Sequence, residues 1–374
     1  MNGNATLLTL FRAGRLRVAS LPQEQPRSTT VPSPGRVRGM LVGLAIGDAL
    51  GNTTESMNPP SRRVLHGEVR DYLPNRRAEG RRVGLPSDDT QLTAWLLESL
   101  LEHDGFEAED VARRFSTRRI FGMGATMRGF VRDRHAGKPL WDCGQSSAGN
   151  GALMRVAAVP AFHLMRPSGS LLSDALLASA LTHNDPTSNA ACVAFAVMLC
   201  ELARMRTAPE PEWWVGRFVQ LARPLEGHVR LRSRVPNSKF AGGLCEFLEA
   251  EVTEALRKQV PALEAMEAWH SGAFLLETVP CVLLLLARYA VSPEAALVRA
   301  VNDTRDNDTV AAIVGAAVGA LHGEQALPSR WRDNLLGRTM ADDDGHLFKL
   351  LDRLTSPGGV RERVQDPNAR GLAG

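Results

Sequence analysis

The sequence is poor in aromatic residues, cysteine and lysine, and it contains no long hydrophobic run. Phe, Trp and Tyr make up 5% of the 374 residues, although apolar residues of all kinds reach 44%. Because the apolar residues are mainly Ala, Leu and Val, with many Gly, we expect closely packed helices rather than sheet. The charged fraction of 23% is that of an ordinary globular protein.

Cysteine usage excludes two classes of small scaffold. The five cysteines are scattered and odd in number, so they form neither a disulfide framework nor a zinc-site spacing. We therefore expect a protein of the reducing cytoplasm. The most apolar run, residues 279–290, contains Pro280 and is far too short to span a bilayer. The N-terminus lacks the apolar segment of a secretory signal, so no membrane partner is expected.

The basic residues do not indicate a nucleic-acid partner. Only four of the 44 basic residues are lysines (138, 239, 258 and 349), and the formal net charge is +3. No DNA- or RNA-binding motif accompanies the arginines. The arginine bias is therefore interpreted as compositional.

Residues 1–36 differ from the rest of the chain. They contain five arginines and a single acid, Glu24, followed by a stretch rich in Ser, Thr and Pro. Three interpretations remain open: a tail or overlong start, an arm that docks on a partner, and, less favoured, a transit peptide. We predict a basic N-terminal arm over 1–36.

The chain from Val37 onwards reads as helix after helix. Gly39, Gly43 and Gly47 are spaced by four and form a small-residue ridge that would admit a second helix. Asp185 followed by Pro186 is a typical helix start. No alternating strand pattern of useful length appears. We predict one all-α domain over 37–357, with an Arg-, Pro- and Glu-rich excursion near 206–240 and a polar tail over 358–374.

Two helices are predicted to begin with clustered acids. SDDT (87–90) precedes one apolar helix and DNDT (306–309) precedes another. Either cluster alone is explained by N-capping and the helix dipole. Both helices, however, are too apolar to lie on the surface, and buried carboxylates repel unless a cation neutralises them. If the two starts meet, hard oxygen ligands suited to Mg²⁺ or Mn²⁺ converge.

Three further features are weaker candidates. Glu55 follows a glycine-rich helix end, where a carboxylate is placed for acid–base work or is simply an exposed loop residue. The turn Gly149–Asn150–Gly151 exposes backbone N–H groups that suit a phosphate, or is only a turn. His183 lies beside a helix cap and is interpreted first as structural.

Together these motifs resemble the ADP-ribosylglycohydrolase family, which includes dinitrogenase-reductase activating glycohydrolases and ADP-ribosyl-acceptor hydrolases. Six stretches match in family order and cover most of residues 37–323. They are GMLVGLAIGDALGNTTE, SDDTQLTAWLLESLL, SAGNGALMRVAAVP, LTHNDPTSNAACVAFAVML, WHSGAFLLETVPCVLLLL and DNDTVAAIVGAAVGALHG.

The resemblance implies a single orthogonal multi-helix fold and two divalent cations, Mg²⁺ first and Mn²⁺ as the alternative. The implied metal ligands are Ser87, Asp88, Asp89, Asp306, Asp308 and Thr309. The implied substrate-binding residues are Ser147, Gly149, Asn150, Gly151, His183, Ser271, Gly272 and Phe274. Ser87 and Arg305 replace the Thr and Gly that the family usually has at these positions.

The resemblance also implies the reaction. The C1″ glycosidic bond of an ADP-ribosylated protein side chain, arginine first, would break through an oxocarbenium-like state. Glu55, Asp88 and Asp89 are the implied catalytic residues, with Asp88 or Asp89 orienting water and Glu55 handling protons or the leaving group. Two alternatives remain: cleavage of serine-linked or O-acetyl ADP-ribose, and an immunity protein whose arm, residues 1–36, blocks an ADP-ribosylating toxin.

Overall fold

The computed structural model describes residues 3–23, 31–236 and 238–356, so the predicted tail 358–374 lies outside the described residues. The first helices are α1 (Gly3–Arg12), α2 (Pro34–Gly51), α3 (Pro59–His66), α4 (Asp88–His103), α5 (Ala108–Thr117), α6 (Ala125–His135), α7 (Ala158–Met165), α8 (Leu171–Ala180) and α9 (Pro186–Leu202). They are followed by α10 (Pro211–Glu226), α11 (Leu244–Phe247), α12 (Thr253–Arg257), α13 (Ala262–Ala268), α14 (Leu275–Tyr289), α15 (Pro293–Asp303), α16 (Asn307–His322), α17 (Ser329–Arg332) and α18 (His346–Thr355).

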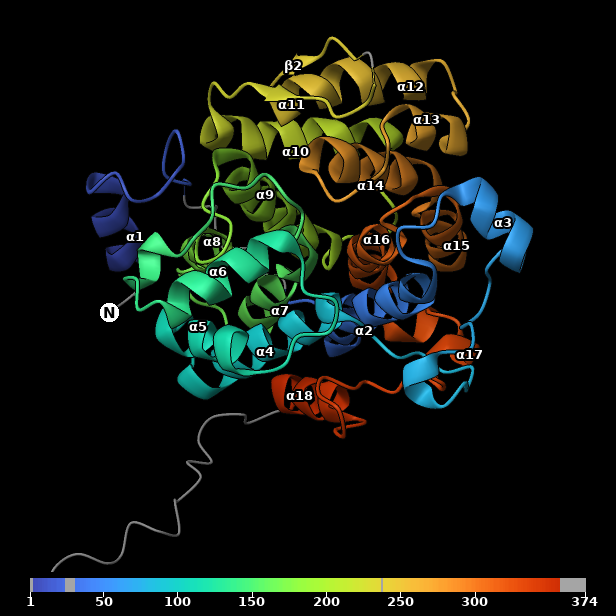
Figure 1. Ribbon diagram of the computed structural model, residues 1–374, viewed down its shortest axis with the longest axis horizontal. Coiled ribbons are helices and arrows are strands. Elements are labelled where there is room, and N and C mark those ends of the chain that lie inside the picture. The colour runs from blue at the N-terminus through green and yellow to red at the C-terminus, as the bar shows by residue number, and fades with distance from the viewer. Residues whose placement is uncertain (1–2, 24–30, 237, 357–374) are drawn as a thin grey trace, which may run out of the picture.

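The predicted all-α fold is confirmed, and Figure 1 shows the helices crossing at steep angles around a central pair, α2 and α16. Within the described residues, the strands are confined to one short antiparallel hairpin of β1 (Leu231–Arg232) and β2 (Ala241–Gly242). A π-helical turn, η5 (Leu248–Val252), joins α11 to α12. None of the helices in the described part of the chain is long and apolar enough to cross a membrane.

Helices α2 and α16 pack against each other closely enough to exclude side chains from their contact. A Cβ atom placed on Gly43 would lie 2.2 Å from the carbonyl oxygen of Gly315, and one on Gly319 would lie 1.9 Å from that of Gly39. The glycine ridge in the sequence therefore does admit a second helix. The pairing is antiparallel, so the C-terminal end of α2 meets the N-terminal end of α16, with Gly51 against Asp308.

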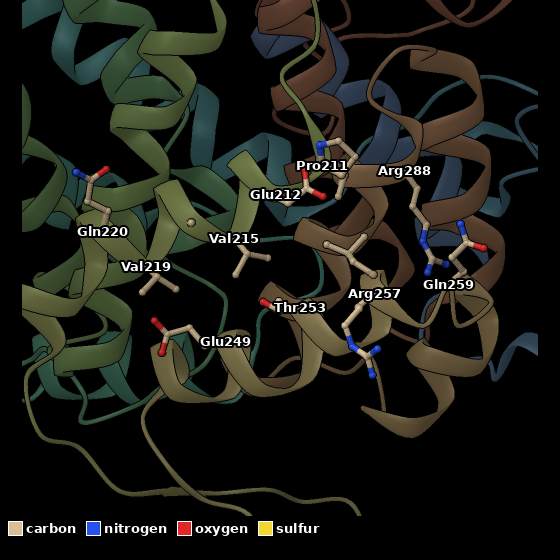
Figure 2. A pocket seen from close by; sticks show the side chains of 13 residues that line it. Pro211, Glu212, Val215, Val219, Gln220, Glu249, Thr253, Arg257, Gln259 and Arg288 are labelled. Atoms are coloured by element: carbon tan, nitrogen blue, oxygen red, sulfur yellow. The ribbon is translucent and has the colours of Figure 1, made fainter.

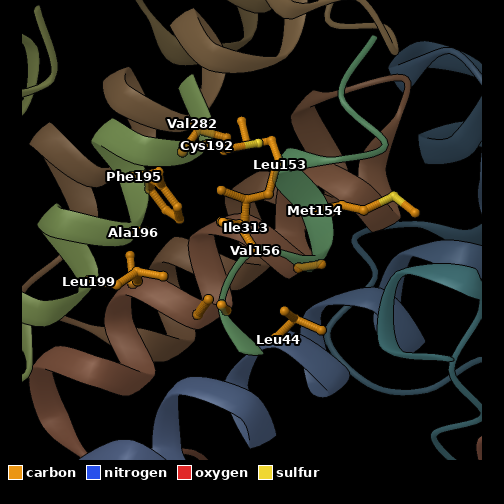
Figure 3. Packing of buried hydrophobic residues seen from close by; sticks show 14 of the residues in the cluster. Leu44, Leu153, Met154, Val156, Cys192, Phe195, Ala196, Leu199, Val282 and Ile313 are labelled. Carbon is orange, nitrogen blue, oxygen red and sulfur yellow. The ribbon is translucent and has the colours of Figure 1, made fainter. Parts of the chain in front are cut away.

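The hydrophobic core surrounds this central pair. Figure 3 shows Leu44 of α2 and Ile313 of α16 packing with Phe195 and Leu199 of α9 and with Leu153. These five side chains are buried. Helices α2, α9 and α16 are thus apolar and buried on nearly all sides. Close packing of this core restrains the start of α16, which carries one of the acid clusters.

The described part of residues 1–36 packs against the rest of the protein. Helix α1 lies on α8, and Leu7, Leu10 and Leu16 are buried. The backbone of Arg17 is held on both sides, because its N–H donates to Asn184 Oδ1 at 3.0 Å and its carbonyl accepts from Asn189 Nδ2 at 3.0 Å. Residues 3–23 therefore form a covering segment with fixed contacts.

Candidate active site

The starts of α4 and α16 meet beside the end of α2, and their carboxylates form two overlapping groups. Asp48, Asp89 and Asp308 offer oxygen atoms that all lie within 4.8 Å of one another. Glu55, Asp306 and Asp308 form a second such group. Asp308 belongs to both groups, so the two potential cation sites are adjacent and share a carboxylate.

The acids at the two helix starts do not act as caps. Ser87 and Asp306 occupy the N-cap positions of α4 and α16, but neither side chain makes a cap hydrogen bond. Ser87 Oγ and Thr309 Oγ1 instead lie 3.4 Å from Asp89 Oδ2. The hydroxyl groups and the carboxylates of the two helix starts therefore face a common centre.

Asp48 of α2 hydrogen-bonds to the start of α4 beside this centre. It lies in α2 with 0% exposure and accepts from the backbone N–H of Ser87 at 2.9 Å and of Thr90 at 3.0 Å. The hydroxyl of Thr90 also donates to Asp48, at 2.6 Å. This carboxylate thus replaces the missing cap of α4 and holds the first turn of the helix, which carries Asp89.

Mutual repulsion and burial make the acidic groups difficult to ionise together. Burial raises the pKa of Asp89 well above its usual value, and the charges of Asp48 and Asp88 raise it further. Burial and then the charges of Asp89 and Asp306 raise the pKa of Asp308 in the same way. Glu55 is exposed at the rim, and partial burial with the charge of Asp306 raises its pKa.

The donor set fits divalent cations. Asp89 Oδ1 is buried and has no hydrogen-bond partner among the described residues, and such an atom costs free energy unless a ligand satisfies it. The surrounding groups are carboxylate and hydroxyl oxygens, which are preferred by Mg²⁺ and Mn²⁺ and not by zinc. Asp88 belongs to neither group of three, although the charges of Asp48 and Glu55 contribute to raising its pKa after burial.

The loop that contains the Gly–Asn–Gly turn reaches the acidic centre through Asn150. Asn150 Nδ2 donates to Asp306 Oδ2 at 2.6 Å and to Thr278 Oγ1 at 2.9 Å. Ser147 Oγ accepts from the backbone N–H of Gly149 at 3.2 Å and lies 2.9 Å from Thr126 Oγ1. The predicted substrate loop and the predicted metal ligands therefore form one continuous site.

His183 lies behind the same loop in a buried position. Its Nδ1 lies 2.9 Å from Thr182 Oγ1, and a Cβ on Gly151 would lie 3.0 Å from its ring. Burial lowers the pKa of His183 well below its usual value, and the charge of Arg155 acts in the same direction. A lowered pKa favours the neutral imidazole, which can donate and accept hydrogen bonds but is a poor general acid.

The segment 270–274 runs along the other side of this loop, with Gly149 paired to Phe274. Ser271 accepts at its carbonyl from the N–H of Asp306 at 3.0 Å. Ser271 has a φ of 45°, a strained value for a residue with a side chain. Phe274 is buried, and the Arg234 guanidinium lies 4.3 Å from its ring centroid.

Arg305, which replaces a family glycine, links both sides of the site through its backbone. Its N–H donates to Ser271 Oγ at 3.2 Å, and its carbonyl accepts from Ser56 N–H at 3.0 Å. Its half-buried side chain makes no ion pair with the described residues.

A separate groove of about 1030 Å³ lies between α10, η5, α12 and the C-terminal part of α14. Figure 2 shows Val215, Val219, Thr253 and Arg288 around it. Arg288 lies near the opposite end of α14 from Phe274, about 20 Å away at 1.5 Å per residue. The groove is therefore distinct from the acidic site.

Comparison with known proteins identifies the family of this chain. The family model described as ADP-ribosylglycohydrolase matches residues 30–362. The chain belongs to the ADP-ribosylglycohydrolase family. It is 26% identical over 350 residues to ADP-ribosylhydrolase ARH3 of Xenopus tropicalis, a match covering 84% of this chain and 95% of that protein. It is 28% identical over 313 residues to ADP-ribosyl-(dinitrogen reductase) glycohydrolase of Rhodospirillum rubrum, covering 80% and 90%.

A solved structure described as an ADP-ribosylglycohydrolase-related protein complex aligns with a TM-score of 0.63 and 27% identity, over 86% of this chain and 99% of that one. The family resemblance and the hydrolase class predicted from the motifs are thereby confirmed.

One residue that organises this ADP-ribosylglycohydrolase site, Asp48, was not singled out from the sequence. Asp48 and Glu55 both lie in the stretch GMLVGLAIGDALGNTTE, but only Glu55 was predicted to be functional. A carboxylate near the C-terminal end of a glycine-rich, apolar helix was the available signal, because buried acids require partners.

Proposed function

We propose that this family member removes ADP-ribose from modified protein side chains by hydrolysing the C1″ glycosidic bond. The observation that carries the proposal is the pair of carboxylate groups sharing Asp308, joined through Asn150 to the predicted ADP-ribose loop. The substrate side of this site carries the turn Gly149–Asn150–Gly151 with His183 behind it, although the N–H groups of Gly149 and Asn150 already donate to Ser147 Oγ and to the Ala273 carbonyl.

We further propose that the site holds two divalent cations. Ser87, Asp88, Asp89, Asp306, Asp308 and Thr309 would hold them, and Asp48 would orient Asp89. When bound, such ions supply positive charge that neutralises the carboxylates and can fix the hydroxyl groups of a ribose. Mg²⁺ is preferred over Mn²⁺ in this proposal only because it is the more usual ion for an all-oxygen site.

Glu55 is proposed to handle the leaving group. It is exposed at the rim and shares a group with Asp306 and Asp308, so it faces both the centre and the solvent. Its pKa is raised by burial and by the charge of Asp306, which makes the carboxyl group easier to protonate, as proton exchange with a leaving group requires. A carboxylate in this position also pairs well with a guanidinium, which favours arginine as the acceptor. Asp88 or Asp89 would orient the attacking water.

The decisive experiment offers arginine-linked, serine-linked and O-acetyl ADP-ribose to the purified protein, with Mg²⁺, with Mn²⁺ and with chelator. We expect ADP-ribose release from the arginine-linked protein, and loss of release with chelator. Glu55→Gln is expected to lower kcat by about 10²- to 10⁴-fold. If none of the three acceptors releases ADP-ribose, the proposal is refuted. If another acceptor is cleaved in preference to the arginine-linked one, only the assignment of arginine is refuted.

The alternative of an immunity protein with a toxin-binding arm receives no support from the described part of the arm. Its side chains Leu7, Leu10 and Leu16 are buried against the protein itself, whereas Leu8 is exposed. The buried leucines are therefore not available as anchors for a partner.

A further inference from the structure

Arg62 in α3 is a buried charged residue to which the proposed reaction assigns no role; its exposure is 0%. We propose that Arg62 is a positioning residue that clamps the loop carrying Glu55 onto the loop that precedes Asp306, and so sets the spacing between the two sides of the acidic site. The inference rests on the site proposed above and is independent of the linkage that is cleaved.

The first half of the clamp spans the Glu55 loop. Arg62 Nε donates to Thr54 Oγ1 at 3.0 Å. Its Nη2 donates to the carbonyl of Thr54 at 3.3 Å and to that of Met57 at 2.9 Å. Because these acceptors lie on both sides of Glu55 in the chain, a single planar group fixes the two ends of the turn from which the Glu55 side chain projects.

The second half of the clamp holds the end of α15 and the residues that lead into α16. Arg62 Nη1 donates to the carbonyl of Asn302 at 3.2 Å and to that of Thr304 at 2.8 Å. Asp306 follows two residues later. The same guanidinium thus contacts the backbone beside Glu55 and the backbone two residues before Asp306. Glu55 and Asp306 belong to one carboxylate group, together with Asp308.

Backbone strain indicates why a clamp is needed. Ser56 has a φ of 64°, in the left-handed region, and its N–H donates to the carbonyl of Arg305 at 3.0 Å. Asn307 Nδ2 adds a hydrogen bond to Thr54 Oγ1 at 2.9 Å. A strained residue persists only where neighbouring contacts over-determine it, and such residues concentrate at functional sites.

The chemistry of the clamp requires arginine. The guanidinium offers five donors in a rigid plane, whereas a lysine ammonium offers three on one atom. Burial lowers the pKa of Arg62 to about 10, against the charges of Asp308 and Asp303, so the group remains protonated at neutral pH. Its positive charge also offsets part of the repulsion among the nearby acids.

The test compares Arg62→Lys with Arg114→Lys. Arg114 is a matched control because it is also a buried guanidinium, with 2% exposure, but it pairs with Glu98, Glu102 and Asp110 on α4 and α5. Both variants are expected to lower Tm. Only Arg62→Lys is expected to accelerate amide hydrogen exchange in peptides 52–58 and 302–308 together, measured in chelator.

Mn²⁺ binding, followed by electron paramagnetic resonance, supplies a second readout. We expect Arg62→Lys to weaken it by about 10- to 100-fold, as substitutions that support metal ligands from behind typically do, and Arg114→Lys to leave it within about twofold of the wild type. Equal effects of the two variants, or unchanged exchange in both peptides of Arg62→Lys, would overturn the proposal. A wild-type protein that does not bind Mn²⁺ would refute the metal site, and the exchange experiment would still decide the clamp.

A milder pair of variants covers the case in which Arg62→Lys does not fold. Thr54→Val removes the hydroxyl that accepts from Arg62 and Asn307, whereas Thr54→Ser retains it. We expect Thr54→Val to reproduce the faster exchange of both peptides and Thr54→Ser to restore wild-type exchange. Indistinguishable behaviour of these two variants would also contradict the clamp.

Discussion

Gly43→Ala is the substitution with the clearest structural consequence, because it adds one methyl group to the contact between α2 and α16. The new Cβ would lie 2.2 Å from the carbonyl oxygen of Gly315 and 2.9 Å from its carbonyl carbon. Both atoms belong to the backbone of a buried helix, so no side-chain rotation relieves the overlap. The two helices must separate, and the carboxylates at their facing ends must separate with them.

Two opposing terms set the magnitude. Alanine stabilises a helix interior by up to about 1 kcal/mol relative to glycine. Overpacking costs about 1–3 kcal/mol, and a clash with backbone lies at the upper end of that range. The net loss is therefore about 2 kcal/mol. At roughly 2.1 cal/mol/K of unfolding entropy per residue, a chain of 374 residues responds with a Tm lower by about 2–3 °C.

The assay is thermal unfolding of Gly43→Ala beside Gly216→Ala, followed by Mn²⁺ titration of both. Gly216 lies within α10, and a Cβ there meets nothing within 4 Å. The same chemical change should therefore raise Tm slightly at Gly216 and lower it at Gly43, with weaker Mn²⁺ binding only at Gly43. A Gly43→Ala protein as stable as Gly216→Ala would refute the reasoning that the glycine contact sets the helix separation.

Three further outcomes are expected. Free Mn²⁺ at 100 times its Kd should stabilise the metal-free protein by about 2.7 kcal/mol, raising Tm by roughly 3 °C; an unchanged Tm argues against the site. Arg305→Gly should change KM severalfold while altering unfolding free energy by less than about 0.5 kcal/mol, and an unchanged KM rules out substrate contact. Burial acts to raise the pKa of Asp110, but the hydrogen bonds that it accepts, first from Arg114, together with the Arg114 charge outweigh burial and lower the pKa to about 2. A depressed carboxylate pKa stabilises the fold above the unfolded value of 3.8, so stability in urea should decrease as pH drops from about 4 towards 2, and less steeply in Arg114→Lys.

Local sequence signals were sufficient where a helix start or a helix surface depends on neighbouring residues alone. Asp185 and Pro186 predicted the start of α9, and the structure confirms both, with Asp185 accepting from Thr187 N–H at 3.0 Å. The spacing of Gly39, Gly43 and Gly47 predicted a close helix contact in the same way. The hairpin of β1 and β2 was missed because strands of two residues leave no periodic pattern.

The same distinction between local signals and contacts made only in the fold applies to the candidate site. Ser87, Asp88 and Asp89, and likewise Asp306, Asp308 and Thr309, could be selected because each set stands at the head of an apolar helix. Their roles as ligands stay predictions, as do those assigned to Glu55 and to the residues of the substrate loop. The sequence could not show that Phe274 is covered by Arg234, because the two residues lie on different elements.

By itself, the sequence determined the helical class, the small-residue ridge and the identity of the acids, since these depend on residue type and on spacing of three or four along one chain segment. Only the tertiary structure decided which helix packs on the ridge, and therefore that the acids of two distant starts share Asp308. It also decided that Asp48 replaces the cap of α4 and that Arg62 joins two loops. These contacts join residues that are 39 positions apart for Asp48 and Ser87 and 242 positions apart for Arg62 and Thr304. No local sequence pattern records how such separate segments pack together.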